Sequence, residues 1–348
     1  MNPYVLMVLL SSLGLGTTLT FASSHWLLAW MGLEINTLAI VPLMAQHHHP
    51  RAVEATTKYF LTQATAAAMI LFASTTNAWI SGEWDMNNLS SPVATTMIIT
   101  ALALKIGLAP MHFWMPEVLQ GMDLLTGLIL STWQKLAPLA LIIQTAQAVD
   151  PLLLTSLGLM STRAGGGGGL NQTQLRKILA YSSIAHMGWM VVILQYPPQL
   201  TLLALGTYIF MTSAAFLTLK TSSATKINTL AMVWSNNPTL MTTTAVVLLS
   251  LGGLPPLTGF MPKWLILQEL AKQDLPITAT IMALAALLSL YFYLRLCYAM
   301  TLTISPNTTN STTPWRVQTT QLSLPLTIST TAALGLLPLT PAILMLVT

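Results

Sequence analysis

Long apolar segments alternate with short polar connections along the whole chain, and this pattern predicts membrane-spanning helices. A spanning helix needs about 20 mostly apolar residues, and eleven segments meet this condition. Their expected bounds are 3–21, 25–44, 56–80, 93–114, 122–146, 150–168, 175–195, 199–219, 239–266, 275–298 and 323–346. The longest polar stretch, Ile304–Gln321, is rich in Thr and Asn and predicts a loop. We therefore expect an all-α, polytopic membrane protein with about eleven transmembrane helices.

Two of these segments carry the same helix-breaking motif. The fourth contains Gly107 and Pro110, and the ninth contains Gly253 followed by Pro255 and Pro256. A shift of 146 residues places one motif on the other, from the first glycine to a shared Met-Pro pair. Proline removes a helix hydrogen bond, and a glycine beside it lets the chain unwind, so both helices are predicted to be broken.

The two broken helices lie five predicted spans apart, so they cross the membrane in opposite directions. Paired, interrupted helices of this kind are typical of inverted-repeat transporters, whose path lies beside the breaks. Proline kinks are also common in ordinary membrane helices, and unrelated kinks are the alternative explanation. We expect one transmembrane domain with a first inverted five-helix repeat over 1–149 and a second over 150–298. A loop and a C-terminal helix follow over 299–348.

The composition supports a bilayer environment. Of the 348 residues, 54% are hydrophobic and 6% are charged, whereas a soluble protein carries about a quarter charged residues. The net charge of +4 is scattered, so no nucleic-acid partner is expected. The single cysteine, Cys297, excludes an internal disulfide and any cysteine-based metal or iron–sulfur site, and we expect no bound metal.

Loop charges predict the orientation. With eleven spans, the side that holds the N-terminus also carries Arg51, Lys58, Arg176, Lys177, Lys220, Lys226, Arg295 and Arg316. The opposite side carries Glu83, Asp85, Asp150, Glu269, Lys272 and Asp274. Because basic residues segregate to the cytoplasm-like or matrix-like side of a membrane protein, the N-terminus is expected there and the C-terminus opposite.

The ionisable residues of greatest interest within the predicted spans are Glu34, Lys105, Lys135, His186 and Lys263. A lysine at the bilayer centre costs about 3 kcal/mol on insertion scales. One structural salt bridge would account for one Glu–Lys pair, but two further lysines would remain unexplained. Lys263 also has the alternative of lying near a helix end and extending to the membrane surface. As a group, these residues predict a role in ion transfer.

Buried lysines suit proton transfer because burial lowers the pKa of a lysine, which can then exchange a proton near neutral pH. A nearby carboxylate has the opposite effect. If Glu34 pairs with Lys105, forming or breaking that pair would switch the proton affinity of the lysine. A neighbouring lysine repels a second charge, so a proton can pass along a row, with Lys135 in its middle.

A second polar group surrounds His186. It follows Ser182 and Ser183 by one helical turn, which gives a polar stripe on one helix face. This stripe fits a proton or water relay, and a single hydrogen bond between helices is the alternative. His112, beside the first break, is a weaker relay candidate.

The five-glycine run Gly165–Gly169 lacks the Gly-Lys-Ser/Thr sequence of a phosphate-binding loop and predicts the end of the sixth helix. The chain shows no pattern of a nucleotide-binding fold, a haem ligand set or a nucleophilic triad. We therefore expect no redox chemistry in this chain itself.

Three long motifs resemble a known family. They are Lys105–Trp114, Leu170–Trp189 and Leu251–Trp264. Over essentially its whole length the chain resembles the chain 2 family of mitochondrial NADH–ubiquinone oxidoreductase, the antiporter-like membrane-arm subunits of respiratory complex I. The resemblance implies a proton-translocating subunit similar to cation/proton antiporters. The segment Ser161–Gly169 departs from the family pattern, since Arg163 and the glycines stand where apolar residues and a tryptophan are usual.

The resemblance also assigns roles to the buried charges. The family's acid falls on Glu34, and the lysine of its first broken helix falls on Lys105. Its central lysine falls on Lys135. The histidine between the lysines falls on His186, and the outlet lysine falls on Lys263. These assignments are what the family implies for this chain.

The resemblance further implies a place in the inner mitochondrial membrane, with the N-terminus on the matrix side and the C-terminus on the intermembrane-space side. The expected partners are other membrane-arm subunits, accessory subunits and lipids. The complex uses NADH, FMN, iron–sulfur clusters and ubiquinone, while this chain binds none of them; a bound phospholipid such as cardiolipin is expected. A stand-alone cation/proton antiporter and a structural membrane anchor are the alternatives. The buried lysines argue against the anchor, and the resemblance favours the complex I subunit over the antiporter.

Overall fold

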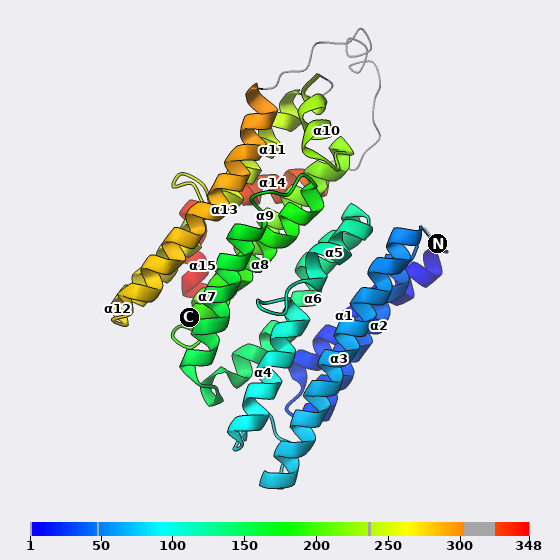
Figure 1. Ribbon diagram of the computed structural model, residues 1–348, viewed down its shortest axis with the longest axis vertical. Coiled ribbons are helices and arrows are strands. Elements are labelled where there is room, and N and C mark those ends of the chain that lie inside the picture. The colour runs from blue at the N-terminus through cyan, green and yellow to red at the C-terminus, as the bar shows by residue number, and fades with distance from the viewer. Residues whose placement is uncertain (1, 47–48, 236–237, 303–323, 348) are drawn as a thin grey trace. The chain divides into compact units, whose positions relative to one another are not determined.

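The computed structural model describes residues 2–46, 49–235, 238–302 and 324–347 (Figure 1). These residues form fifteen α-helices and a few short 3-10 turns, and the described segments contain no β-strand beyond two isolated bridges. The expected all-α class is confirmed. The loop expected over 304–321, with Arg316, lies outside the described residues.

The chain divides into two compact units, Met1–Ser161 and Thr162–Thr348. The helices of unit 1 are α1 Pro3–Ala22, α2 Trp26–Met44, α3 Pro50–Ser81, α4 Pro92–Ile106, α5 Trp114–Gly121 and α6 Leu124–Thr145. Helix α7, Pro151–Gly168, begins in unit 1 and ends in unit 2. The helices that follow in unit 2 are α8 Leu175–Ile193, α9 Pro198–Ser222, α10 Ile227–Met232, α11 Pro238–Gly252, α12 Phe260–Lys272, α13 Pro276–Leu302, α14 Leu324–Gly335 and α15 Thr340–Val347.

In unit 1, α2 packs against both α1 and α3 (Figure 1). The approach of α1 to α2 depends on two facing glycines, since a Cβ on Gly16 would lie 2.8 Å from the Gly32 carbonyl oxygen. A Cβ on Gly32 would lie equally close to the Gly16 carbonyl oxygen, at 2.8 Å. Small residues at such crossings let membrane helices gain van der Waals contact where lipid removes the hydrophobic driving force. This packing carries the middle of α2 into the interior of the unit.

In unit 2, the glycine run at the end of α7 likewise lets neighbouring helices approach closely. A Cβ on Gly165 would lie 2.5 Å from the backbone nitrogen of Ala185 in α8. A Cβ on Gly169 would lie 2.8 Å from the ring of Phe292 in α13. The helix ends at Gly168, where the sequence predicts an end.

Pairs of connections meet at one end of each unit. In unit 1, Trp26 N–H donates to the Trp84 carbonyl over 3.1 Å, which joins the α1–α2 connection to the α3–α4 connection. In unit 2, Leu175 N–H donates to the Thr225 carbonyl over 3.1 Å, which joins the α7–α8 connection to the α9–α10 connection. Alternating helix directions produce this arrangement within a unit.

Five of the described helical segments are long and apolar enough to cross a membrane, or six if the bent pair α14–α15 is one span. They are Pro3–Ala22, Trp26–Met44, Leu124–Ala148, Pro198–Ser222 and Pro276–Leu302. Helices α4 and α11 are apolar but shorter. A multi-pass helical membrane protein is therefore confirmed, and the count of eleven spans stays a prediction.

The C-terminal segment corrects one expectation. The sequence predicts a single helix over 323–346, but α14 and α15 are bent by 66° at a short break. Helix α14 ends at Gly335, and a 3-10 turn with Pro338 follows before α15 begins. Proline lacks an N–H, and glycine adds backbone freedom, so a straight helix does not continue through this stretch.

Candidate functional site

The first break connects α4 to α5. Gly107 follows the last residue of α4 with φ 85°, a left-handed conformation that glycine adopts without strain. Beyond it, the Ala109 N–H donates to the Ser161 hydroxyl over 2.9 Å. The Trp114 indole N–H donates to the carbonyl of Leu104 over 3.0 Å. The first bond satisfies a backbone N–H that the break leaves without a helical partner. The second adds a donor to a carbonyl that also accepts from the Gly107 N–H over 3.2 Å.

Beside this break, unit 1 encloses a cavity of about 20 Å³. Two predicted proton-transfer residues, Lys105 from α4 and Lys135 from α6, line it together. Both side chains are buried, with 7% of Lys105 and 2% of Lys135 exposed. The cavity is lined by Leu33, Asn36, Thr37, Tyr59, Gln63, Lys105, Ile106, Trp114, Met115, Leu130, Gln134, Lys135, Ala137 and Pro138.

Glu34 lies at the edge of this group. Its carboxylate accepts a hydrogen bond from the Thr37 hydroxyl over 3.1 Å, and Thr37 lines the cavity. The carboxylate is close enough to interact electrostatically with Lys105. The direct pairing suggested by the sequence is not formed here, because the Lys105 Nζ has no hydrogen-bond partner among the described residues.

Two cavity amides were missed by sequence reasoning, which considered only charged residues and their neighbours. Both polar atoms of the Asn36 side chain, and the Gln63 side-chain nitrogen, are buried without a hydrogen-bond partner among the described residues. A cavity holds a water molecule when it offers about 10–15 Å³ and two or more polar partners. The space around these groups is therefore enough for roughly one or two waters. Amides in the middle of apolar helices are the sequence signal that could have identified them.

His112 takes a different position. It is buried at 7% exposure and its ring lies 4.4 Å from that of Phe113, centroid to centroid. It is not among the residues that line the cavity of unit 1. The structure therefore does not bring it together with Lys105 and Lys135 at this cavity.

The second break connects α11 to α12. Gly253 has φ 84°, as Gly107 does in the first break at 85°. The Lys263 ammonium reaches back across the break and donates to the Gly252 carbonyl over 2.8 Å. The Thr258 hydroxyl donates to the Ala333 carbonyl, which ties the break to α14.

Unit 2 encloses its own cavity of about 10 Å³ beside this break. His186 and Lys263 line it together, with Ser182. Tyr293 and Ser289 complete its polar lining. The cavity is lined by Ser182, Ala185, His186, Trp189, Lys263, Ser289 and Tyr293.

The remaining member of the predicted polar stripe lies elsewhere. Ser183 is buried and its hydroxyl donates to the Ala180 carbonyl over 2.7 Å, and it is not among the cavity's lining residues. On the His186 side, the ring of Tyr208 lies 5.5 Å from the imidazole, centroid to centroid. Each unit therefore places a lysine from its broken helix beside a small polar cavity. Such a cavity can hold a proton on an amine and pass it through water.

Two family models match the chain. "NADH:quinone oxidoreductase/Mrp antiporter, TM" matches residues 23–289, and "NADH dehydrogenase subunit 2 C-terminus" matches residues 290–344. The chain is 84% identical to NADH-ubiquinone oxidoreductase chain 2 of Carassius auratus, over 100% of both chains. It is 79% identical to the chain of the same description from Danio rerio, again over 100% of both.

Solved structures share the fold. A chain of respiratory complex I from Thermus thermophilus with bound aureothin is 28% identical with a TM-score of 0.84, covering 97% of this chain and 78% of that one. A chain of the Mrp complex from Dietzia sp. DQ12-45-1b is 15% identical with a TM-score of 0.84. That match covers 97% of this chain and 76% of the other, and at this identity it shows the fold alone.

Proposed function

Because the chain belongs to the chain 2 family of NADH-ubiquinone oxidoreductase, and so is a subunit of respiratory complex I, we propose that it moves protons through a row of buried side chains. The row comprises Glu34, Lys105, Lys135, His186 and Lys263. NADH oxidation and ubiquinone reduction in other subunits supply the energy. The observation that carries the proposal is the pair of buried lysines, Lys105 and Lys135, on one small cavity.

The geometry of unit 1 supports a switch at the start of the row. A proton on Lys105 is stabilised when the Glu34 carboxylate comes closer, and is released more easily when it withdraws. Among the described residues no hydrogen bond holds the Lys105 ammonium, so it is poised to give its proton to a neighbour. Lys135, on the same cavity, is the receiving group, and the charge it gains opposes a second proton on Lys105.

Water in the cavity completes the transfer. Two lysine amines that are too far apart for a direct hydrogen bond can exchange a proton only through a group between them that both donates and accepts, such as a water molecule. The side-chain amide of Asn36 and the side-chain nitrogen of Gln63, which have no hydrogen-bond partner among the described residues, would hold such a water in place. These two residues are therefore part of the proposed relay, as groups that orient water and carry no charge.

Unit 2 supports the outlet end. His186 and Lys263 line one cavity, and Ser182 of α8 lines it with them. The Lys263 ammonium is already held by the Gly252 carbonyl. In the proposal His186 receives the proton that leaves Lys135, and Lys263 releases it to the far side. His112 and Ser183 remain weaker candidates.

The membrane topology is part of the proposal. Eleven spans result if α4 with α5, α11 with α12, and α14 with α15 each form one crossing, and if α3, α7 and α8 also cross. The two broken helices then belong to inverted repeats over 1–149 and 150–298. The hydrogen-bonded connections at one end of each unit support alternating helix directions. The N-terminus is placed on the matrix side and the C-terminus on the intermembrane-space side by the loop charges.

Cofactors and partners follow the same assignment. This chain binds none of the NADH, FMN, iron–sulfur clusters and ubiquinone that the complex uses, while a phospholipid such as cardiolipin occupies its lipid-facing surface. Neighbouring antiporter-like and small membrane subunits and accessory subunits are its partners. A stand-alone cation/proton antiporter is the second candidate, supported by the fold shared with the Mrp complex and by a family model whose description covers both kinds of protein. Native electrophoresis separates them, because a subunit of complex I migrates in a very large assembly with NADH dehydrogenase activity.

The test of the relay is Lys135→Met in the assembled complex. Methionine keeps the length and apolar character of the lysine stem but carries no proton, so pumping should be abolished while the chain still folds and assembles. The control is Lys220→Met, which removes an exposed lysine at the end of α9. Proton uptake by inner-membrane vesicles is measured per NADH oxidised, and unchanged pumping in Lys135→Met would contradict the proposal.

A further inference from the structure

Helix α5, the second half of the first broken helix, lies against the first turns of α3 through residues spaced one helical turn apart. On α5 these are Trp114, Glu117 and Gly121. A Cβ on Gly121 would lie 2.6 Å from the Arg51 carbonyl oxygen, at the very start of α3. The Trp114 and Tyr59 rings lie 5.7 Å apart, two turns further along α3. The contacts advance along α3 as they recede along α5, so the two helix faces pack antiparallel.

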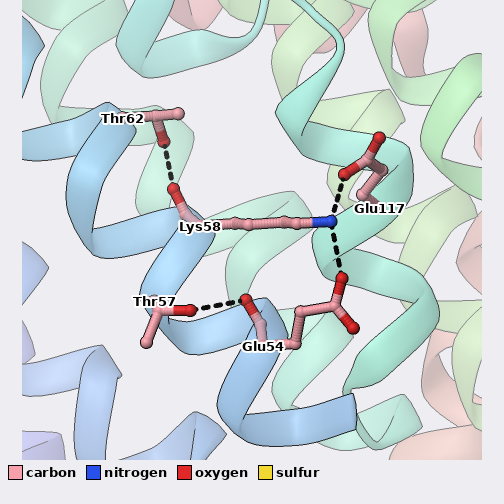
Figure 2. Close-up of polar contacts among 5 residues, drawn as sticks. All are labelled: Glu54, Thr57, Lys58, Thr62 and Glu117. Carbon is pink, nitrogen blue, oxygen red and sulfur yellow. Dashed lines mark hydrogen bonds and ion pairs between the residues drawn. The ribbon is translucent and has the colours of Figure 1, made fainter.

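Between these two contacts lies a charged cluster at the surface. Figure 2 shows the Lys58 ammonium between two carboxylates, Glu54 from its own helix α3 and Glu117 from α5. Both N···O distances are 2.7 Å. The side chains are exposed by 43% for Lys58, 62% for Glu54 and 53% for Glu117. Only the bond to Glu117 joins two helices.

The docked face of α5 continues into the proton-transfer cavity. Trp114 lines that cavity, and its indole N–H holds the carbonyl of Leu104, the residue that precedes Lys105. Tyr59, the neighbour of Lys58 along α3, lines the same cavity. A shift of α5 away from α3 would therefore move Trp114, remove its hydrogen bond to the Leu104 carbonyl and open the wall beside Lys105.

We propose that Lys58 is a positioning residue, whose ion pair with Glu117 holds α5 against α3 and so keeps the wall of the Lys105 cavity closed. The effect on proton transfer rests on the relay proposed above, whereas the docking of α5 does not. An exposed ion pair shifts the equilibrium between α5 packed against α3 and α5 displaced from it by about two- to fivefold. A contact of this strength can break and re-form during a working cycle.

The arrangement itself provides a matched pair of variants. Glu117→Gln and Glu54→Gln each remove one carboxylate that lies 2.7 Å from the same ammonium. Glu117→Gln breaks the bond between helices, while Glu54→Gln breaks a bond within α3. A role limited to local charge balance predicts equal effects of the two variants, and a positioning role predicts an effect of Glu117→Gln alone.

The experiment measures hydrogen exchange of the amides of Trp114–Gly121 and protons pumped per NADH in the assembled complex. Glu117→Gln should raise exchange of this segment about two- to fivefold and lower the pumping ratio, while NADH oxidation continues. Glu54→Gln should leave both unchanged. The double variant Lys58→Glu with Glu117→Lys places opposite charges on the two helices again and should restore both values.

Equal exchange in Glu117→Gln and Glu54→Gln would overturn the docking role. Raised exchange with normal pumping would overturn the positioning role. If Glu117→Gln did not assemble, the unmodified complex can be tested instead, because salt screens an exposed ion pair. Hydrogen exchange of Trp114–Gly121 should then rise between about 0.01 M and about 1 M salt. Exchange that does not depend on salt would overturn the proposal. Failure of the relay is seen separately, as normal pumping by Lys135→Met.

Discussion

Lys105 lies before the first break, in the last turn of α4, and its ammonium has no hydrogen-bond partner among the described residues. Lys263 lies after the second break, in the first turn of α12, and its ammonium donates to the Gly252 carbonyl over 2.8 Å. The same shift of 146 residues that joins the two motifs pairs Lys263 with Glu117, not with Lys105. The two broken helices thus carry their lysines in different halves, Lys105 before the break and Lys263 after it. Of these two ammonium groups, only that of Lys263 has a hydrogen-bond acceptor among the described residues.

The backbones of the two breaks differ in how closely their halves approach. At the start of α12, Gly259 lies under the Ser250 carbonyl so closely that any Cβ would collide with it. The same position of the first motif is Phe113, which is 70% exposed. The second break is therefore folded back closely on its first half at Gly259, while the first break has room at the matching position for an exposed aromatic side chain.

The largest expected effect tests this difference in closeness. Gly259→Ala places a methyl group against a backbone carbonyl that cannot move without unfolding the break, so we expect a loss of more than about 3 kcal/mol and little assembled complex. Phe113→Ala at the matching position should change stability by no more than about 0.5 kcal/mol. Native electrophoresis of membranes from both variants measures the assembled fraction. Normal assembly of Gly259→Ala would mean that the second break is as open as the first.

The next prediction tests whether only one lysine is held. Lys263→Met removes a charged donor from the Gly252 carbonyl, whereas Lys105→Met removes an ammonium that forms no hydrogen bond with any described residue. Both variants remove a buried charge. The difference in stability between them therefore measures the hydrogen bond, which contributes about 1.5–3 kcal/mol. Heat inactivation of the assembled complex should therefore be faster in Lys263→Met. Equal rates would show that the bond at Gly252 contributes nothing, although pumping should fail in both.

Much of this architecture could be predicted from the sequence because it rests on local rules. The apolar segments gave helix bounds close to the observed ones, and Gly107 and Gly253 marked the breaks because their φ values are those glycine adopts readily. The bend between α14 and α15 was missed, since the prolines beyond Gly335 were outweighed by an apolar composition that suits one helix. Whether a lysine is held depends on tertiary contacts, and spacing does not contain that information.

The candidate site shows the same division. Charge inside an apolar segment was enough to predict Lys105, Lys135 and Lys263 as candidates, without any contact information. The amides of Asn36 and Gln63 carry no charge, so a prediction based on charged residues did not include them, although both lie inside predicted spans. Glu117 was not predicted as a functional residue, although the shift of 146 residues pairs it with Lys263. It lies in the first turn of α5, where acidic residues are common in any helix.

A smaller effect concerns the bonds that fix each break to a neighbouring helix. Ser161→Ala leaves the buried Ala109 N–H of the first break without its acceptor, which should cost about 1–2 kcal/mol. Thr258→Val removes the bond from the second break to α14 and should cost about 1 kcal/mol. Hydrogen exchange should rise at Ala109 in the first variant and within Leu324–Gly335 in the second. Exchange that rises at α14 in neither variant would mean that Thr258 does not anchor the C-terminal segment.

The smallest expected change in stability tests the proposed role of water in the cavity of unit 1. Gln63→Met keeps the length of the side chain and replaces a buried nitrogen that has no hydrogen-bond partner among the described residues. Since no bond to a described residue is lost at that nitrogen, stability should change by no more than about 0.5 kcal/mol. If that nitrogen orients a water between Lys105 and Lys135, pumping per NADH should nevertheless fall. Unchanged stability together with unchanged pumping would show that Gln63 does not orient a water in the proposed transfer between the two lysines.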